Sequence, residues 1–290
     1  MTSTALILVI LAAFIHASWN LLTEKAAKAG AAFVLAYSVF ATLFYAPWVV
    51  YLIATGAMNW TWEAVGFILL STVLHLLYSL CLQTGYAKAD LSVVYPVARG
   101  TGPLLSSLVA VFLLGEMMTS QTGAGLVLVV GGILLIATQG NFRAFLSPSG
   151  REGVGWGMAT GGMIAGYTVV DAYAVRVIGT APVILDWFNN ILRAAILLPV
   201  VLSDRQKAAE AMRGHWGAAI LVGLLSPASY ILVLIALEMG APVTIVAPLR
   251  ETSMMVGALM GLFILREKVG PWRIVGCVVL AGGAALLASA

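Results

Sequence analysis

Two arginines inside apolar stretches, each shortly after a proline, are the residues whose positions most suggest chemistry. Arg99 follows Pro96 within the apolar run 91–114, and Arg250 follows Pro248 in a similar run near the other end of the chain. A guanidinium presents a planar fork of N–H donors that fits a carboxylate. A cation at membrane depth costs about 2.5–3.5 kcal/mol on insertion scales, so such arginines commonly mark a substrate path or a water-filled cavity. The pair therefore predicts a site for a small molecule that carries a negative group.

Further polar side chains fall at helical spacing within the apolar runs, so that each run presents one polar face. Lipid cannot satisfy such groups, and we expect these faces to point inward, toward one another or toward water. We predict that the following residues contact substrate: His75, Tyr78, Tyr95, Arg99, Asp171, Trp187, Tyr230 and Arg250. We predict coupling or gating roles for a second group: His16, Asn20, Pro96, Asn190, Pro248 and Glu251.

The predicted contact residues suit a zwitterion. The arginines would bind a carboxylate, Asp171 or tyrosine hydroxyls would bind an ammonium, and aromatic faces would accept an apolar or aromatic side chain. Structural interpretations stay open beside this one. Arg99 would form an ion pair with Asp171 or Glu251, and Glu251 is also a ready neighbour for Arg250. His75 is either a hydrogen-bonded histidine of the helix bundle or a proton-linked group, since histidine changes charge near neutral pH.

Other polar residues favour structural roles. Asp186 and Arg193 predict an ion pair near the start of their helix. Trp187 is compatible with a lipid-facing position as well as with a stacking wall, and the tyrosines with hydrogen bonds between helices. Glu116 and Glu267 stand at the ends of two apolar runs, where a capping or folding role is favoured.

The composition places the chain in a membrane. Its 290 residues are 61% hydrophobic and 9% charged, and its mean hydropathy is +1.02. Soluble domains carry about 25% charged residues. The apolar runs have the length of membrane-spanning helices, about 20 residues, and do not alternate like barrel strands. We therefore expect an all-α polytopic membrane protein, with a lipid bilayer around it and no nucleic-acid partner.

Ten candidate membrane spans follow from the apolar runs. They are expected at 3–23, 31–54, 62–86, 90–114, 119–138, 153–176, 181–202, 215–238, 242–265 and 270–289. The connection 139–152 is the longest. It divides the chain into a five-helix half at 1–138 and a second five-helix half at 153–290.

The two halves repeat, and their charges predict opposite orientations. Matching positions are Pro96 and Pro248, Arg99 and Arg250, Glu116 and Glu267, Gly125 and Gly276, and the pairs Gly131-Gly132 and Gly282-Gly283. The paired glycines are expected at close helix contacts. Among the Lys and Arg of the loops, all but Arg176 lie in odd-numbered loops, so equivalent loops of the two halves carry opposite bias. The positive-inside rule then predicts inverted repeats, basic loops in the cytoplasm and both termini outside.

Two matching segments carry a family resemblance. Residues 113–137, which begin L-L-G-E-M-M-T-S, and residues 264–287, which begin I-L-R-E-K-V-G-P, resemble the end of an EamA repeat of the drug/metabolite transporter superfamily. The stretch H-A-S-W-N at 16–20 is similar to the first helix of that family. Within the superfamily the chain looks most like the YddG-type amino-acid and metabolite exporters. The resemblance implies ten helices in two inverted five-helix repeats around a central cavity, with the fifth and tenth helices as scaffold.

The expected function is transport. We expect a secondary-active or facilitative transporter that exports amino acids, including aromatic ones, or related small metabolites by alternating access. Proton-coupled export of cationic drugs and exchange of phosphate esters or nucleotide sugars stay open as alternatives. An intramembrane enzyme is disfavoured, because the sequence has no H-E-x-x-H, G-x-S-x-G or phosphate-cradling motif. We expect no catalytic residue, metal or cofactor, and a monomer in the plasma (inner) membrane.

Overall fold

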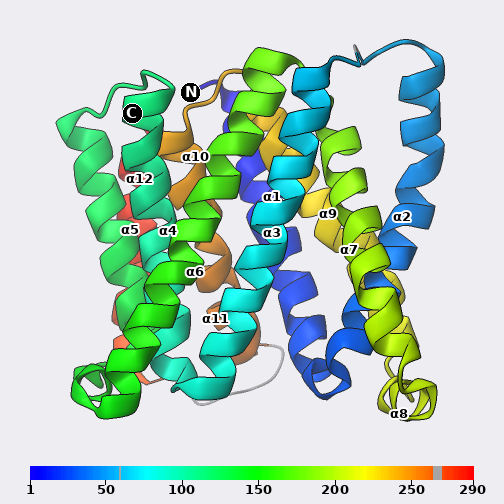
Figure 1. Ribbon diagram of the computed structural model, residues 1–290. Helices are drawn as coiled ribbons and strands as arrows, with labels where there is room; N and C mark the ends of the chain where they lie inside the picture. Colours follow the sequence, from blue (N-terminus) through cyan, green and yellow to red (C-terminus); the bar gives the residue numbers. More distant parts are fainter. Residues whose placement is uncertain (59, 264–269) are drawn as a thin grey trace.

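A bundle of long helices forms the protein. The computed structural model describes residues 1–58, 60–263 and 270–290, and within these residues every regular element is a helix. Figure 1 shows the long helices side by side, with both termini at the same end. The long helices are α1 (Ser3–Lys25), α2 (Gly30–Ala54), α3 (Trp62–Lys88), α4 (Leu91–Leu113), α5 (Ser120–Thr138), α6 (Pro148–Tyr173), α7 (Pro182–Leu202), α9 (Trp216–Glu238) and α12 (Pro271–Ala288). The shorter ones are η1 (Ala27–Ala29), η2 (Phe142–Leu146), η3 (Ala174–Ile178), α8 (Arg205–Ala211), α10 (Val243–Arg250) and α11 (Thr252–Phe263).

Nine segments of the described chain are long and apolar enough to cross a membrane, and α10 with α11 counts as one of them. The remaining predicted span corresponds to α6, which has 26 residues but is rich in glycine and carries Arg151, Glu152 and Asp171. Its polarity fits its position, because α6 packs against α3 and α4 and most of its second half is buried. The crossing of a membrane by α6 stays a prediction.

The two halves run in opposite directions, as the charge pattern predicts. In Figure 1, α1 starts at the end of the bundle where both termini lie, whereas α6 starts at the other end. The short helix α8, which the apolar runs did not predict, lies at that second end (Figure 1). Its first turn is capped by Asp204, whose Oδ1 accepts the backbone N–H of Lys207 at 3.1 Å.

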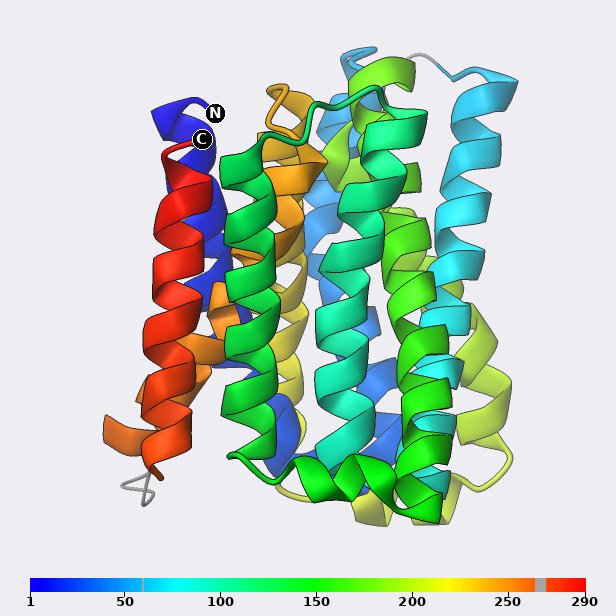
Figure 2. The same cartoon turned by 90° about the vertical axis from the view of Figure 1, so that its left-hand side faces the viewer.

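Glycines let α5 and α12, the last helices of the two halves, touch along their backbones. Figure 2 shows α12 in red beside α5 in green. A Cβ added at Gly132 would lie 2.8 Å from the carbonyl oxygen of Gly276, and one at Gly283 would lie 2.8 Å from that of Gly125. A Cβ at Gly131 or at Gly282 would meet no atom within 4 Å. Only one glycine of each predicted pair therefore serves this contact.

Pro96 and Pro103 favour a bent or locally broken helix, and α4 has no break at either proline. The helix is continuous from Leu91 to Leu113, with Pro96 and Pro103 inside it. Each proline removes one backbone hydrogen bond. The close packing of α6 along α4 offsets this loss: a Cβ at Gly157 would lie 2.6 Å from Cβ of Val97.

In the second half the matching helix is interrupted. Helix α10 ends at Arg250, α11 starts at Thr252, and Glu251 forms the turn between them. All eight residues of α10 are buried, so the interruption lies in the interior. The break follows Pro248, for which a coupling or gating role is predicted. The end of the predicted ninth span, at 264–265, and Arg266, Glu267 and Lys268 lie outside the described residues.

Candidate functional site

An ion pair between the two halves forms the centre of the candidate site. The Nη1 atom of Arg99 on α4 lies 3.2 Å from Oε2 and 3.4 Å from Oε1 of Glu251, at the α10–α11 break. The side chain of Arg99 is 13% exposed and that of Glu251 is 1% exposed. Of the two predicted structural partners of Arg99, the structure therefore selects Glu251 and not Asp171.

Arg99 has two further partners. Its Nη2 lies 3.1 Å from Nε2 of His16 on α1, and its Nε donates to the hydroxyl of Tyr95 at 3.4 Å. The guanidinium also lies over the Tyr95 ring, 5.6 Å from its centroid. The predicted residues His16, Tyr95, Arg99 and Glu251 are thus brought together from α1, α4 and the α10–α11 break.

Arg250, the counterpart of Arg99 in the second half, lies near the same carboxylate. Its Nε is 3.8 Å from Oε1 of Glu251, and its side chain is 7% exposed. The Nε atom is buried and has no hydrogen-bond partner within the described part of the chain. A single carboxylate therefore faces two guanidinium groups, which leaves the arginines with capacity for a further anionic group.

Asp171 on α6 is the second buried charge of the site. Its side chain is fully buried, and Oδ2 accepts a short hydrogen bond from the hydroxyl of Tyr230 on α9. The same Oδ2 lies 3.2 Å from Nε2 of His75 on α3. Oδ1 has no hydrogen-bond partner in the residues that the structure describes. Three helices therefore hold one carboxylate, half of whose hydrogen-bonding capacity is unused.

Aromatic rings surround Asp171. The ring of His75 stacks on that of Tyr167 with centroids 4.0 Å apart and meets that of Tyr230 edge-on at 5.6 Å. Tyr78 meets Tyr167 edge-on at 5.8 Å. Tyr167 was not among the predicted contact residues. Its position one helical turn before Asp171 is the sequence pattern that indicates its place in the site.

Three predicted residues lie apart from these contacts. The indole N–H of Trp187 donates to the backbone carbonyl of Thr42 on α2 at 2.9 Å, so this residue joins α7 to α2. Asn190 donates to the backbone and side-chain oxygens of Asp186, one turn earlier on the same helix. Asn20 is half-buried and takes part in none of the side-chain hydrogen bonds found in the described chain.

The predicted ion pair between Asp186 and Arg193 does not form. Within the described residues Asp186 is bonded to Asn190, and Arg193 donates to the hydroxyl of Tyr37 on α2 at 3.4 Å. A spacing of seven residues leaves two full turns between the two charges, and nearer partners satisfy each of them. Sequence reasoning also missed Asn189, which joins α7 to the buried Ser71 and Thr72 of α3.

Glu116 caps a helix of the other half. Its two carboxylate oxygens accept the backbone N–H groups of Val243 and Thr244 at 2.8 and 2.9 Å. These are the first donors of α10, which have no partner within that helix. Arg176 on η3 adds an ion pair at 2.7 Å. The predicted capping role of Glu116 is therefore confirmed, with the cap placed on a helix distant in sequence.

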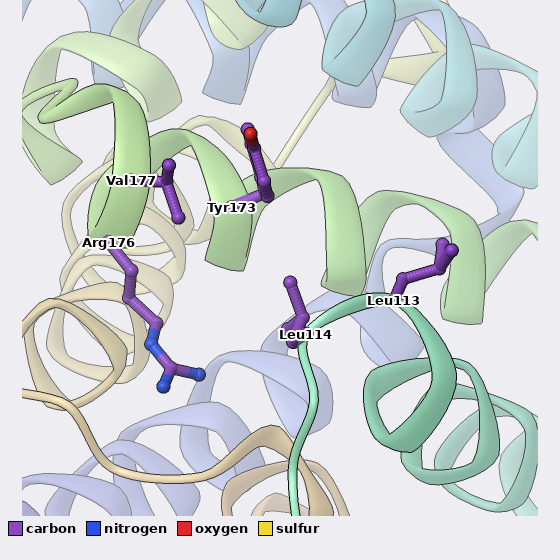
Figure 3. A pocket seen from close by; sticks show the side chains of 5 residues that line it. All are labelled: Leu113, Leu114, Tyr173, Arg176 and Val177. Carbon is purple, nitrogen blue, oxygen red and sulfur yellow. The ribbon is translucent and has the colours of Figure 1, made fainter.

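Cavities occur at two places away from these charges. One, of about 300 Å³, lies beside the Glu116 contacts at the end of α4 and is lined by Leu113, Leu114, Tyr173, Arg176 and Val177 (Figure 3). The other, of about 340 Å³, is an apolar groove between α2 and the α7–α8 corner, with Trp216 beside it. Neither is lined by Arg99, Arg250 or Asp171. The side chains around these three residues pack on one another, and the predicted central cavity stays a prediction.

Metal ligation has no support in the part of the chain that the structure describes, since no group of three or more His, Cys, Asp or Glu side chains is placed to hold an ion. The described site contains fixed charges and hydrogen-bonding side chains. Buried guanidinium, carboxylate and aromatic groups are suited to a polar molecule.

Comparisons with known proteins agree with the helical fold in two halves. The model of the EamA-like transporter family matches the chain twice, over residues 3–138 and residues 151–289. A solved structure entitled "Crystal structure of protein" is similar in fold, with a TM-score of 0.75. Its sequence is 18% identical, and the match covers 99% of this chain and 99% of that chain. At this identity the second comparison speaks for the fold alone.

Proposed function

Because the chain belongs to the EamA-like transporter family, we propose that it exports amino acids or related small metabolites by alternating access. The family and the long apolar helices make it a multi-pass membrane transporter of small molecules. The predicted EamA resemblance is thereby confirmed. The YddG-type branch, the amino-acid substrate and the direction of transport belong to the proposal.

Two unused atoms of opposite charge carry the proposal. Among the described residues, Nε of Arg250 and Oδ1 of Asp171 are buried and lack hydrogen-bond partners. Tyr230 on α9 donates to Asp171 on α6, and α10, which carries Arg250, packs against both helices. Buried charged groups without partners are costly. A zwitterion offers a carboxylate to the arginine and an ammonium to the aspartate, and so satisfies both.

Glu251 would act as the internal substitute for the substrate carboxylate. It neutralises Arg99 at 3.2 Å and is near Arg250 at 3.8 Å. A substrate carboxylate that bound the arginines would replace part of these contacts and free Glu251 to move. Since Glu251 forms the turn between α10 and α11, substrate binding would act directly on the interruption in the helix.

The aromatic rings around Asp171 suit the remainder of an amino acid. Tyr230 donates to the carboxylate that would hold the ammonium, and the rings of Tyr167 and Tyr78 follow it in edge-on contacts. Aromatic pairs of this kind gain about 0.5–1.5 kcal/mol beyond their burial. We therefore expect preference for amino acids with apolar or aromatic side chains over those with acidic ones.

Alternating access requires that the contacts between the halves open on one side at a time. At the end of the bundle that holds the termini, Glu116 ties the α4–α5 connection to α10 and η3. Arg99 and Glu251 tie the halves together deeper in the bundle. We propose that the described conformation is closed around the site and that substrate release breaks one of these ties. With the basic loops in the cytoplasm, the Glu116 tie would face outside.

Purified protein in liposomes tests the proposal directly. We expect labelled amino acids with apolar or aromatic side chains to exchange across the membrane, and organic cations not to exchange. Empty liposomes and liposomes with the Arg99→Ala variant serve as controls. Uptake of cations together with indifference to amino acids would reject the proposed substrate class.

One observation favours a second candidate, the export of cationic drugs. Asp171 is a fully buried carboxylate with His75, Tyr167 and Tyr230 around it, and aromatic rings beside an acid attract organic cations. The nearby arginines oppose a cation that lacks a carboxylate. The same liposome panel separates the two candidates, because the cation candidate requires transport that does not depend on Arg250.

A further inference from the structure

We propose that Asp171 and His75 together form a proton-binding site, and that a proton and the ammonium of the substrate compete for Asp171. The inference rests on the proposed function and deepens it. It makes the protein an antiporter, in which a proton that enters from one side replaces the substrate leaving on that side. Substrate export would then be driven by the proton gradient.

The geometry fits a carboxylate that accepts and releases a proton. Oδ2 of Asp171 is held by the hydroxyl of Tyr230 and lies 3.2 Å from Nε2 of His75. Oδ1 has no hydrogen-bond partner among the described residues and is the position for the incoming ammonium, whereas Oδ2 is the position for a proton from His75. A carboxylate in membrane interior is costly as an isolated charge, so each state of the cycle needs a positive partner for it.

His75 is the more accessible member of the pair. Its side chain is 13% exposed, whereas that of Asp171 is fully buried. Histidine is the side chain that ordinarily gains and loses a proton between about pH 5 and pH 8. A proton taken up by the imidazole therefore reaches the carboxylate across a single 3.2 Å contact. Stacking of His75 on Tyr167 fixes the ring in the orientation that this transfer requires.

The surrounding charges decide how many cations the site accepts. The titratable and charged groups that face the pair or its neighbours are Tyr78 on α3, Arg99 on α4, Tyr167 on α6, Asp186 and Arg193 on α7, Tyr230 on α9, Arg250 on α10, and Glu251. The arginines disfavour more than one added positive charge at Asp171. A proton and an ammonium each bring one, so binding of either weakens binding of the other, and this exclusion is the basis of coupled exchange.

Asp186 is the rival carboxylate, since it is also buried. Its Oδ2 accepts from the side-chain amide of Asn190, which cannot deliver a proton. The rings around Asp171 are that of Tyr167 and those of its neighbours His75, Tyr78 and Tyr230. In the described chain, none of these rings is a partner of Asp186. Asp186→Asn is therefore the matched control for Asp171→Asn, because both changes replace a buried acid by an amide of the same shape.

The first test needs no substrate. Infrared spectra of the purified protein, recorded between about pH 5 and pH 8, report the C=O stretch of a protonated carboxylic acid. We expect a band that grows as the pH falls, persists in Asp186→Asn and is absent from Asp171→Asn. We expect His75→Gln to shift the midpoint of this titration. A band that is lost in Asp186→Asn and kept in Asp171→Asn overturns the site, as does a midpoint that His75→Gln leaves unchanged.

The second test adds an apolar amino acid, phenylalanine, to lightly buffered protein. We expect release of protons on binding, and in liposomes an outward movement of substrate against its gradient when the outside is acidified. Transport of phenylalanine without proton release overturns the coupling. An Asp171-dependent infrared band without any response to amino acids supports the proton site and rejects the proposed substrate class, so the two failures can be told apart.

Discussion

Arg99 and Glu251 pair across the two halves of the molecule, with Nη1 of the arginine 3.2 Å from Oε2 of the glutamate. Arg99 has a counterpart in Arg250, but the position that matches Glu251 in the first half is Gly100. The repeat therefore supplies two guanidinium groups and one carboxylate. The carboxylate also lies at the interruption between α10 and α11, which the continuous α4 lacks. The asymmetry of charge and the asymmetry of backbone coincide at Glu251.

Removal of the Glu251 charge is the first prediction. Glu251→Gln leaves Arg99 and Arg250 without their shared anion, and the loss of one partner of a buried pair costs about 3–5 kcal/mol. We expect a lower thermal unfolding midpoint in detergent. We also expect added substrate to raise this midpoint by more in the variant than in the unchanged protein, because the substrate carboxylate replaces the missing charge. Glu63→Gln, at the exposed start of α3, is the control. Equal midpoints for all three proteins would show that the pair does not stabilise the fold.

The second prediction is that transport depends on the shape of the arginine side chain and not only on its charge. Arg99→Lys and Arg250→Lys keep a positive charge and lose the planar fork that binds a carboxylate through two N–H groups. We expect each change to lower the initial rate of amino-acid exchange in liposomes by at least about tenfold, which corresponds to about 1.4 kcal/mol. Arg193→Lys is the matched control, since Arg193 contacts Tyr37 outside the site. A variant of Arg99 or Arg250 that exchanges as fast as this control would remove that arginine from the substrate contacts.

The third prediction is that loss of the Glu116 contacts opens the end of the bundle that holds the termini. Glu116→Gln removes the charge that caps α10 and pairs with Arg176, and the loss of a helix cap costs about 0.5–2 kcal/mol. We expect Val177→Cys, beside this contact, to react faster with a water-soluble thiol reagent when Glu116 is changed. Cys81 and Cys277 are replaced by alanine in all proteins compared.

The labelling rate distinguishes two roles for Glu116. In one it is a tie that restricts opening, and in the other it is only a local cap. Faster labelling with slower exchange of substrate supports a tie that must close during transport. An unchanged labelling rate at Val177→Cys would show that Glu116 stabilises α10 alone. Tyr86→Cys, on the exposed face of α3, gives the rate for a site that does not depend on Glu116.

Local patterns predicted what depends on local physics. The spacing of Tyr95 and Arg99, or of Tyr167 and Asp171, follows from the helical repeat, and the interior position of these faces follows from the insolubility of polar groups in lipid. The inverted halves followed from loop charges. Which residues pair with one another depends on the distances between helices. These distances cannot be derived from the spacing of residues along the sequence. For this reason the ion pair of Arg99 with Glu251 was one of two options.

Packing decides several contacts that local preferences do not indicate. Pro96 and Pro103 favour a bent or locally broken helix, but α4 packs against α6 and is continuous. Trp187 shares a helix with polar residues, but its indole N–H donates to a backbone carbonyl on α2. The cap by Glu116 joins residues more than a hundred positions apart, and no short-range pattern indicates which helix a carboxylate at a span end will cap.

Adjacent glycines on α5 give the last prediction, which tests the contact between the two halves independently of the charged site. A Cβ at Gly132 would lie 2.6 Å from Cβ of Leu280 and 2.8 Å from the carbonyl oxygen of Gly276, whereas a Cβ at Gly131 would meet no atom within 4 Å. Gly132→Val must push α5 and α12 apart, and overpacking of this kind costs about 1–3 kcal/mol or more. We expect a lower unfolding midpoint and aggregation in size-exclusion chromatography for Gly132→Val, and behaviour close to the unchanged protein for Gly131→Val. Equal behaviour of the two variants would contradict the close contact, because both changes add the same side chain to neighbouring positions of one helix.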